Sequence, residues 1–285
     1  MCNDTDLAGF ARTGLTRRDF AATGALAGLA ACTSMDSGSD AGELTESMVS
    51  IPTADGTMDA FFVHPRQPAP AVILWPDIAG LREVKKAMAR RLAGEGYAVL
   101  VANPYYRDTP APQFADFADF MKANGFAKVT PWRNRATSQA TIRDGKALVA
   151  WLDGQRAVDR RRGVGNQGYC MGGSYTVYTA AAAPSRVKAA ASFHGGGLVT
   201  DKPDSPHRML QPGTSYLFAI GQNDDAKQPE AKGELRKAAD AAGAKAEIEV
   251  YSADHGWCVP DSPVYNAAEA ERAWARLLAL YSAAL

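Results

Sequence analysis

Apolar runs of strand length alternate with longer segments of helical spacing along most of this chain, and this alternation restricts the fold more than any other feature of the sequence. The repeated order of strand, helix and strand is typical of an α/β fold in which helices cover both faces of a mostly parallel central sheet. The predicted strands span residues 58–64, 71–75, 97–102, 162–168, 187–193, 215–220 and 246–251. The predicted helices span residues 83–94, 137–151, 173–183, 230–242 and 265–280.

The size and charge of the chain limit the number of domains and the kinds of partner molecule that we expect. A length of 285 residues with 46% apolar residues is sufficient for one α/β domain, which we place at residues 46–285. Basic and acidic residues balance at 31 each, so no field of a single sign favours nucleic acid or an anionic membrane surface. We therefore expect a small neutral or weakly charged partner molecule, no nucleic acid, and a monomer or small homo-oligomer.

The amino-terminal residues resemble an export signal. The paired arginines Arg17 and Arg18 precede an apolar stretch of small residues at 21–31, which is the order of a twin-arginine signal. Residues 34–42 are rich in Ser, Asp and Gly and are typical of a flexible tether. We interpret residues 1–45 as signal and tether, and we expect a periplasmic protein.

The four cysteines show no paired spacing such as C-x-x-C, which argues against a disulfide framework or a zinc site; we expect no metal and no cofactor. Residues 29–32, Leu-Ala-Ala-Cys, resemble the bacterial lipobox, in which Cys32 would carry a lipid anchor. The alternative is an ordinary signal-peptidase site with Cys32 incidental. No apolar run approaches the roughly 20 residues that a spanning helix requires.

A glycine-rich turn at residues 168–173 carries the candidate nucleophile. Its sequence, Gly-Tyr-Cys-Met-Gly-Gly, lies between a predicted strand and a predicted helix, as a nucleophile elbow does, here with Cys170 in place of serine. The helix amino terminus favours a thiolate, and the Met171 N–H is the natural first donor to an oxyanion. The alternative is that Cys170 is only a small buried apolar side chain.

The chain order supplies partners for Cys170. In α/β-hydrolases an acid and then a histidine follow the nucleophile, each after a later strand. Asp224 and Asp225 follow the predicted strand 215–220, and His255 follows the strand 246–251. His255 would hold Cys170 as an ion pair or take its proton, and the acid would fix the tautomer and orientation of the imidazole. We prefer Asp224 over Asp225, although such a pair is also a common turn former; the alternative for His255 is a loop histidine bonded to solvent.

These residues resemble the dienelactone hydrolase family from about Met48 to the carboxyl end. The motifs that carry the resemblance lie at residues 75–81, 96–100, 103–107, 168–173, 221–224 and 255–257. The resemblance implies an α/β-hydrolase that cleaves carboxylic esters or lactones through a thioester acyl-enzyme. It further implies a triad of Cys170, Asp224 and His255, a second oxyanion donor at Ile78, and substrate carboxylate binding by Arg107.

Two departures from the family pattern point away from dienelactone itself as the substrate. Asp77 stands where the family has a glutamate that assists activation of the thiol, and no second arginine follows His255, because residues 258–261 read Cys-Val-Pro-Asp. The alternative for Asp77 is an exposed loop carboxylate. The alternative for Arg107 is an ion pair with a surface acid.

Three further features leave alternatives open. Five aromatic residues crowd the stretch 114–132 and form either a lid or pocket wall, or core packing under an inserted helix. His194 either lines the pocket or has a structural role. Cys258 lies three residues past His255, and a disulfide with Cys170 in an oxidising periplasm is a hypothesis.

The hydrolase interpretation accounts for more residues than its rivals. A carrier or binding protein that kept the scaffold but lost turnover is the main alternative, because a fold does not by itself specify activity. A thiol redox protein would need a resolving C-x-x-C pair that this sequence lacks.

Overall fold

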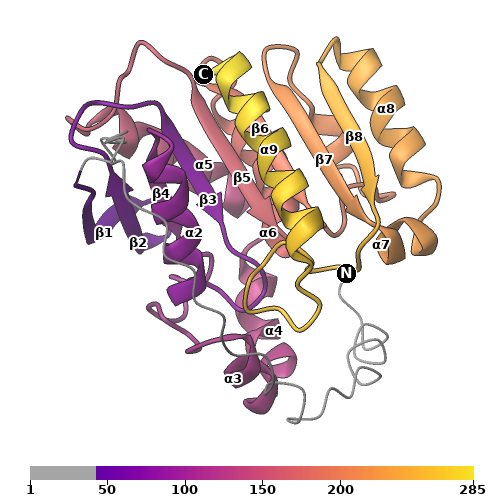
Figure 1. Cartoon of the computed structure of the whole chain (residues 1–285), viewed down its shortest axis with the longest axis horizontal. Coiled ribbons are helices and arrows are strands. Elements are labelled where there is room, and N and C mark those ends of the chain that lie inside the picture. The colour runs from indigo at the N-terminus through magenta and orange to yellow at the C-terminus, as the bar shows by residue number, and fades with distance from the viewer. Residues whose placement is uncertain (1–42) are drawn as a thin grey trace, which may run out of the picture. The chain divides into compact units, whose positions relative to one another are not determined.

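One eight-stranded sheet organises residues 43–285, the part of the chain that the computed structural model describes (Figure 1). Its strand order is β1-β2-β4-β3-β5-β6-β7-β8. β2 runs antiparallel to both of its neighbours, whereas all pairs from β4 to β8 are parallel. The strands are β1 (Thr45–Thr53), β2 (Gly56–His64), β3 (Ala71–Trp75), β4 (Ala98–Ala102), β5 (Val164–Tyr169), β6 (Val187–Phe193), β7 (Ser215–Gly221) and β8 (Ala246–Tyr251). The predicted mostly parallel sheet is confirmed.

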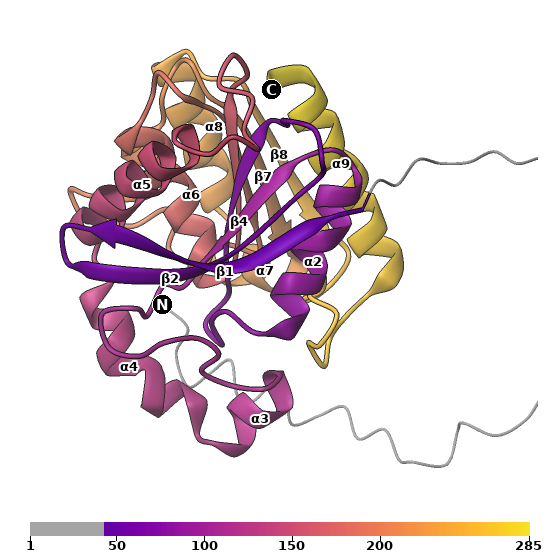
Figure 2. The ribbon, with the colours of Figure 1, turned by 90° about the vertical axis from the view of Figure 1, so that its left-hand side faces the viewer.

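Helices cover both faces of this sheet (Figure 2). They are α2 (Glu83–Gly94), α3 (Phe117–Lys122), α4 (Gly125–Arg135), α5 (Ser138–Asp153), α6 (Met171–Ala182), α7 (Gln222–Lys227), α8 (Ala231–Ala242) and α9 (Ala267–Ala284), with a short 3₁₀ helix, η2 (Pro206–Met209). α2 and α9 lie on one face, and α5, α6 and α8 lie on the other. Each predicted helix is present, with its ends shifted by a few residues at most.

The central strands are buried on both sides, as the continuous apolar runs predict. In β3, Ile73 and Trp75 belong to the core beneath α5 and α6, whereas Val72 and Leu74 belong to the core beneath α2 and α9. This two-residue alternation is the pleat of a strand, and full burial of both faces is typical of parallel sheets. Truncating one such side chain to alanine costs about 2–5 kcal/mol in a well-packed core.

Helix ends follow local capping chemistry. The Thr137 hydroxyl accepts the Ala140 N–H at the start of α5, and the Asn266 side chain accepts the Glu269 N–H at the start of α9. α8 ends at Gly243, whose φ of 64° is left-handed and suits glycine. These caps satisfy amide and carbonyl groups that have no partner within the helix.

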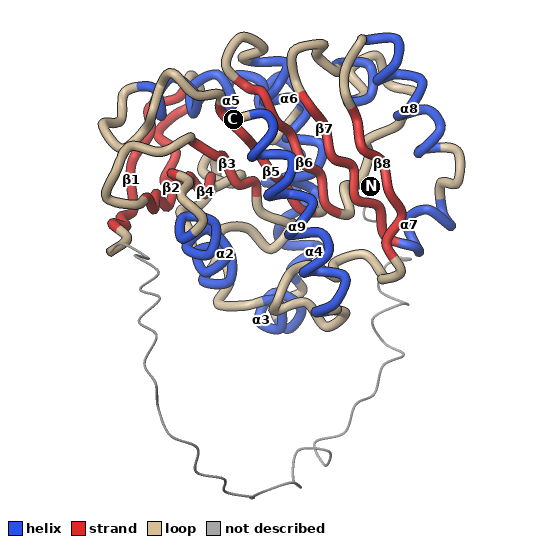
Figure 3. Tube along the Cα trace, turned by 45° about the horizontal axis from the view of Figure 1, so that its top comes forward, coloured by secondary structure: helices blue, strands red, loops and turns tan. Residues whose placement is uncertain are grey.

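α3 and α4 lie beyond the carboxyl ends of the central strands, outside the two helical layers (Figures 1 and 3). Their aromatic residues form a small third core, in which Phe114 and Phe120 are buried with Ile78 and Tyr105. Partly buried members of the same stretch pack around them: Phe117, Phe126 and Trp132. The stretch therefore has the inward packing that the core interpretation predicts, and it forms a cap, residues 114–135, over the segment that follows β3.

One strand of the sheet was not predicted, and one predicted segment lies outside the described residues. β1 was not predicted; it is an edge strand on which only Ile51 is buried, so its apolar signal is weak. The proposed export signal, the tether and Cys32 lie outside the described residues. Between residues 43 and 285, no helix is both long and apolar enough to cross a bilayer, and no three His, Cys, Asp or Glu side chains gather to hold a metal ion.

Candidate active site

Cys170 occupies a strained position between β5 and α6. Its φ of 52° and ψ of −114° are rare for a residue with a side chain, and such conformations cost on the order of 1–3 kcal/mol. Backbone hydrogen bonds hold it: its N–H donates to the Phe193 carbonyl at 3.1 Å, and its own carbonyl accepts the N–H of Gly173 at 3.0 Å and of Gly196 at 3.2 Å. Strain that is held in this way is a feature of functional sites.

The flanking glycines close the turn. A Cβ on Gly168 would overlap the carbonyl group of Gly172, and a Cβ on Gly172 would lie 2.5 Å from the Pro76 carbonyl oxygen. Real side chains do not approach backbone this closely, so both positions require glycine. The second contact brings the amino terminus of α6 directly against the segment that follows β3.

Both predicted oxyanion donors lie in this junction. Met171 is the first residue of α6, so its N–H has no acceptor within the helix. Ile78 is buried after β3, and its carbonyl accepts the Tyr105 hydroxyl at 2.7 Å. The same hydroxyl lies 3.5 Å from the Met171 sulfur. Tyr105, which the sequence did not single out, therefore contacts both residues and fixes the orientation of the Ile78 peptide.

His255 and Asp224 are bound to each other at the ends of β8 and β7. The His255 Nδ1 lies 2.8 Å from one Asp224 carboxylate oxygen and 3.1 Å from the other, and the His255 N–H donates to the Asn223 side chain at 2.8 Å. Asp225 instead pairs with Lys232 at 2.7 Å. The structure thus places Asp224, rather than Asp225, against the histidine. His255 is held by protein groups, in contrast to the solvent-bonded alternative.

The loop after β6 connects Cys170 to this pair. The Cys170 N–H is hydrogen-bonded to the Phe193 carbonyl. His194, which follows Phe193, packs its ring against the ring of His255, with 4.7 Å between the ring centres. The carboxyl ends of β5, β6, β7 and β8 all lie at one edge of the parallel sheet. Cys170, His255 and Asp224 therefore all follow strands whose carboxyl ends lie at that edge.

A buried charge cluster lies beside the turn and is centred on Asp77. The Asp77 carboxylate accepts Arg82 at 2.7 and 3.1 Å and the Ala79 N–H at 3.0 Å, and it lies 2.8 Å from the Lys85 ammonium. Asp77 is only 5% exposed, so the alternative of an exposed loop carboxylate is wrong. Burial alone would raise the pKa of Asp77, but the charges of Arg82 and Lys85 outweigh it and hold that pKa well below its usual range.

Asp261 completes this cluster. It accepts Arg82 through two bonds of 2.7 Å and the Phe117 N–H at 3.0 Å. The family pattern has an arginine after the histidine. In this chain Asp261 lies there instead, and its carboxylate binds Arg82 at the start of α2. Lys85, also fully buried, lies 4.4 Å from the centre of the Tyr169 ring, and burial lowers its pKa.

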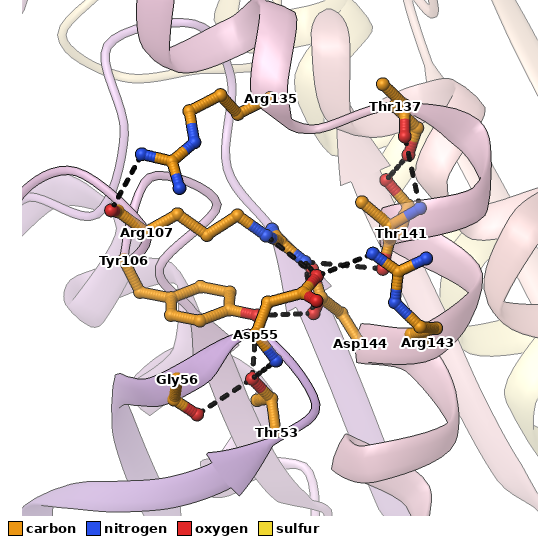
Figure 4. Close-up of polar contacts among 11 residues, drawn as sticks. Thr53, Asp55, Gly56, Tyr106, Arg107, Arg135, Thr137, Thr141, Arg143 and Asp144 are labelled. Atoms are coloured by element: carbon orange, nitrogen blue, oxygen red, sulfur yellow. Dashed lines mark hydrogen bonds and ion pairs between the residues drawn. The ribbon is translucent and has the colours of Figure 1, made fainter.

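Arg107 lies in a separate ion-pair network (Figure 4). Its guanidinium is 2.7 Å from Asp55 and 2.8 Å from Asp144, and it stacks over the Tyr106 ring at 4.5 Å. Arg143 binds the same Asp55 carboxylate at 2.7 Å. The network joins the β1–β2 turn to α5. Two protein carboxylates neutralise Arg107, which is the arrangement that the ion-pair alternative describes.

A cavity of about 260 Å³ lies between α2 and α9, behind the turn. Its wall is mostly apolar and includes Tyr169, Phe193 and Cys258. Neither Met171 nor Ile78 is among the residues that line this cavity. Cys258 is not joined to Cys170 by a disulfide, and burial raises the pKa of its thiol, which keeps it protonated.

The strand order, the strained turn after β5 and the acid and histidine after β7 and β8 define an α/β-hydrolase. The sequence profile of the dienelactone hydrolase family matches residues 58–285. The chain therefore belongs to the dienelactone hydrolase family and is a hydrolase of that type, so the carrier alternative is not retained.

Individual relatives agree with this assignment. The chain is 32% identical to an Escherichia coli K12 protein named "Putative carboxymethylenebutenolidase", over 80% of this chain and 83% of that one. It is 26% identical to the carboxymethylenebutenolidase of Pseudomonas sp. strain P51, over 76% of this chain and 88% of that one. A solved structure described as "Putative Dienelactone Hydrolase" from Klebsiella pneumoniae superposes with a TM-score of 0.70 at 26% identity, covering 85% of this chain and 99% of that one.

Sequence reasoning missed the cations around Asp77. Arg82 is the N-cap residue of α2 and Lys85 lies three residues later in its first turn, and both side chains reach back to Asp77 in the preceding segment. That spacing, directly after an acidic loop residue, is the signal that would have paired them with Asp77. Asp261 had no local signal, because it lies 179 residues from Arg82 in the chain.

Proposed function

We propose that the protein hydrolyses small carboxylic esters or lactones through Cys170, His255 and Asp224, with a thioester acyl-enzyme as the intermediate. The observation that carries this proposal is the 2.8 Å contact of Asp224 with His255 Nδ1, at the same sheet edge as the strained Cys170 turn. The family assignment and the names of the relatives support an ester or lactone substrate.

The acylation half begins with the histidine. The Asp224 carboxylate accepts a hydrogen bond from His255 Nδ1–H and so leaves a lone pair on Nε2. That nitrogen takes the proton of the Cys170 thiol, and the thiolate attacks the substrate carbonyl carbon. The N–H groups of Met171 and Ile78 bind the resulting oxyanion. When the tetrahedral intermediate collapses, the ester bond breaks, and the proton on His255 passes to the departing alkoxide.

The deacylation half uses the same groups with water as the nucleophile. His255 takes a proton from water, and the hydroxide attacks the thioester carbonyl. Collapse of the second tetrahedral intermediate breaks the carbon–sulfur bond and releases the acid. The proton on His255 then returns to the Cys170 thiolate, which restores the starting state.

Asp77 has a supporting role in this proposal. A general base works best when its pKa lies near the operating pH, whereas Arg82 and Lys85 keep Asp77 ionised far below neutral pH. We assign the thiol proton to His255 for this reason. Asp77 instead accepts the Ala79 N–H and so holds the Ile78–Ala79 peptide, which directly follows the Ile78 N–H donor.

The test compares Cys170→Ala and Cys258→Ala with the wild type on short-chain aryl esters and on a panel of lactones. We expect Cys170→Ala to lose ester hydrolysis by several orders of magnitude and to form no acyl adduct in mass spectra of the quenched enzyme. Cys258→Ala, a buried thiol on the other side of the turn, should keep turnover within a fewfold. Equal rates in the wild type and Cys170→Ala would remove Cys170 from the mechanism.

We also propose export of the protein through the twin-arginine route to the periplasm, from the order of residues 16–31. Replacing Arg17 and Arg18 together by lysine should leave the protein in the cytoplasmic fraction. Periplasmic recovery of the double variant at the wild-type level would contradict this proposal.

A further inference from the structure

His194 is a buried histidine that the proposed mechanism does not use. It follows β6, is 1% exposed, and has a left-handed φ of 40°. Its backbone N–H donates to the Ala219 carbonyl at 2.8 Å, which fixes the residue in this conformation. Within residues 43–285, neither ring nitrogen has a hydrogen-bond partner. An apolar residue would fill the same space without that desolvation cost, so simple packing does not account for an imidazole here.

The ring of His194 lies edge-to-face against two neighbours from the loop after β8. Its centre is 4.7 Å from that of His255, at an interplanar angle of 64°, and 5.3 Å from that of Trp257, at 67°. Trp257 is itself fully buried. Asp224 binds His255 through Nδ1, so the histidine ring contacts Asp224 at one atom and His194 at another part of its surface.

The surroundings of His194 keep it neutral. Burial lowers its pKa well below the usual range, and the charges of His255 and Lys85 act in the same direction, against a smaller opposite effect of Asp77. A neutral aromatic ring attracts a cation that lies over its face, whereas a second imidazolium would repel that cation. The arrangement therefore favours a proton on His255 over a proton on His194.

We propose that His194 is a positioning residue, which holds the His255 ring in place and stabilises its protonated form during both half-reactions. This inference rests on the proposed function, because it concerns the state of His255 in which the ring carries the proton of Cys170 or of water.

The test uses three substitutions in the full-length protein. His194→Leu and His194→Gln remove the aromatic ring, and His194→Phe restores one. We expect the first two to lower kcat roughly threefold to tenfold with KM within twofold of wild type, since the lost attraction is of cation–π size. His194→Phe should return kcat to within about twofold of wild type, a rescue expected if the ring face, not the nitrogens, carries the effect.

A second readout measures His255 without turnover. NMR titration of the His255 imidazole in a Cys170→Ala background should show its pKa lower by about half a unit with His194→Leu than without it. The titratable groups around the two rings are Asp224 from α7, Lys85 from α2, Asp77 after β3, Tyr169 from β5, and Cys170, which this background removes.

The outcomes separate the two proposals. An unchanged kcat and an unchanged His255 titration in both His194→Leu and His194→Gln would overturn the role of His194. So would a loss in His194→Phe as large as that in His194→Leu, when the circular dichroism spectra of both match wild type. Full activity of Cys170→Ala would instead remove the proposed mechanism, and the titration would still measure the contact between the two histidines.

Discussion

Replacing Asp77 by asparagine removes the negative charge at the centre of the buried cluster and keeps the shape of the side chain. Arg82 retains its two bonds to Asp261, so the charge left without compensation is the Lys85 ammonium, which is fully buried and 2.8 Å from Asp77. Breaking a buried ion pair in this way costs about 3–5 kcal/mol. We expect Asp77→Asn to lower the free energy of unfolding by that amount.

Urea unfolding followed by circular dichroism measures this change, with Glu271→Gln as the matched control. Glu271 pairs with Arg91, and the two side chains are 55% and 45% exposed. Loss of this exposed ion pair should lower the free energy of unfolding by roughly 0–1 kcal/mol. Adding Lys85→Met to Asp77→Asn removes the stranded charge and should recover most of the loss. If Asp77→Asn costs no more than Glu271→Gln, the cluster does not stabilise the fold as reasoned.

The same variant has a defined pH dependence. The pKa of Asp77 is lower in the folded state than in the unfolded state, so its contribution is fully present above an unfolded pKa of about 4 and is lost as the pH falls towards the folded value. The gap in unfolding free energy between wild type and Asp77→Asn should therefore shrink between pH 5 and pH 2. A gap that widens over this range would contradict the assigned direction of the shift.

Three further predictions follow from the site. Asp224→Asn should lower kcat/KM on the order of 10³–10⁴-fold in steady-state assays, whereas Asp225→Asn, which only loses a lysine partner, should change it less than threefold. Gly168→Ala should abolish activity and lower the unfolding midpoint, because the added Cβ meets backbone atoms. Gly196→Ala has open space around the added carbon, so its free energy of unfolding in denaturant should stay within about 0.5 kcal/mol of the wild-type value. Arg107→Met should lower the free energy of unfolding by about 3–5 kcal/mol, because it breaks two ion pairs. The ratio of KM for carboxylated esters to KM for neutral esters should stay unchanged. A selective rise in KM for carboxylated esters would instead support substrate binding by Arg107.

The parts of the fold that could be predicted are those with a strong local pattern. β3 is a continuous apolar run and β6 is a mostly apolar one, and both were predicted with their observed ends. The turn around Cys170 was predictable because glycines at fixed spacing report close backbone approaches, here those at Gly168 and Gly172. The order of acid and histidine along the chain placed Asp224 and His255 at the correct strand ends.

What the sequence left open depends on contacts between distant segments. Asp224 and Asp225 are neighbours in the short helix α7, and contacts with distant segments separate their environments: His255 meets Asp224, and Lys232 from α8 meets Asp225. Charged residues such as Arg82 are expected at the surface, and the burial of Arg82 becomes favourable only once Asp77 and Asp261 meet it. No local pattern contains that information.

The double role of Asp261 has a consequence for engineering. Its carboxylate binds both Arg82, beside the Cys170 turn, and the backbone N–H of Phe117, the first residue of α3 in the cap. The cap, residues 114–135, therefore cannot be replaced independently of Asp261. A chimera that takes this segment from a relative will seat it in the same way only if position 261 still offers an acceptor, so recombination libraries should carry the two regions together.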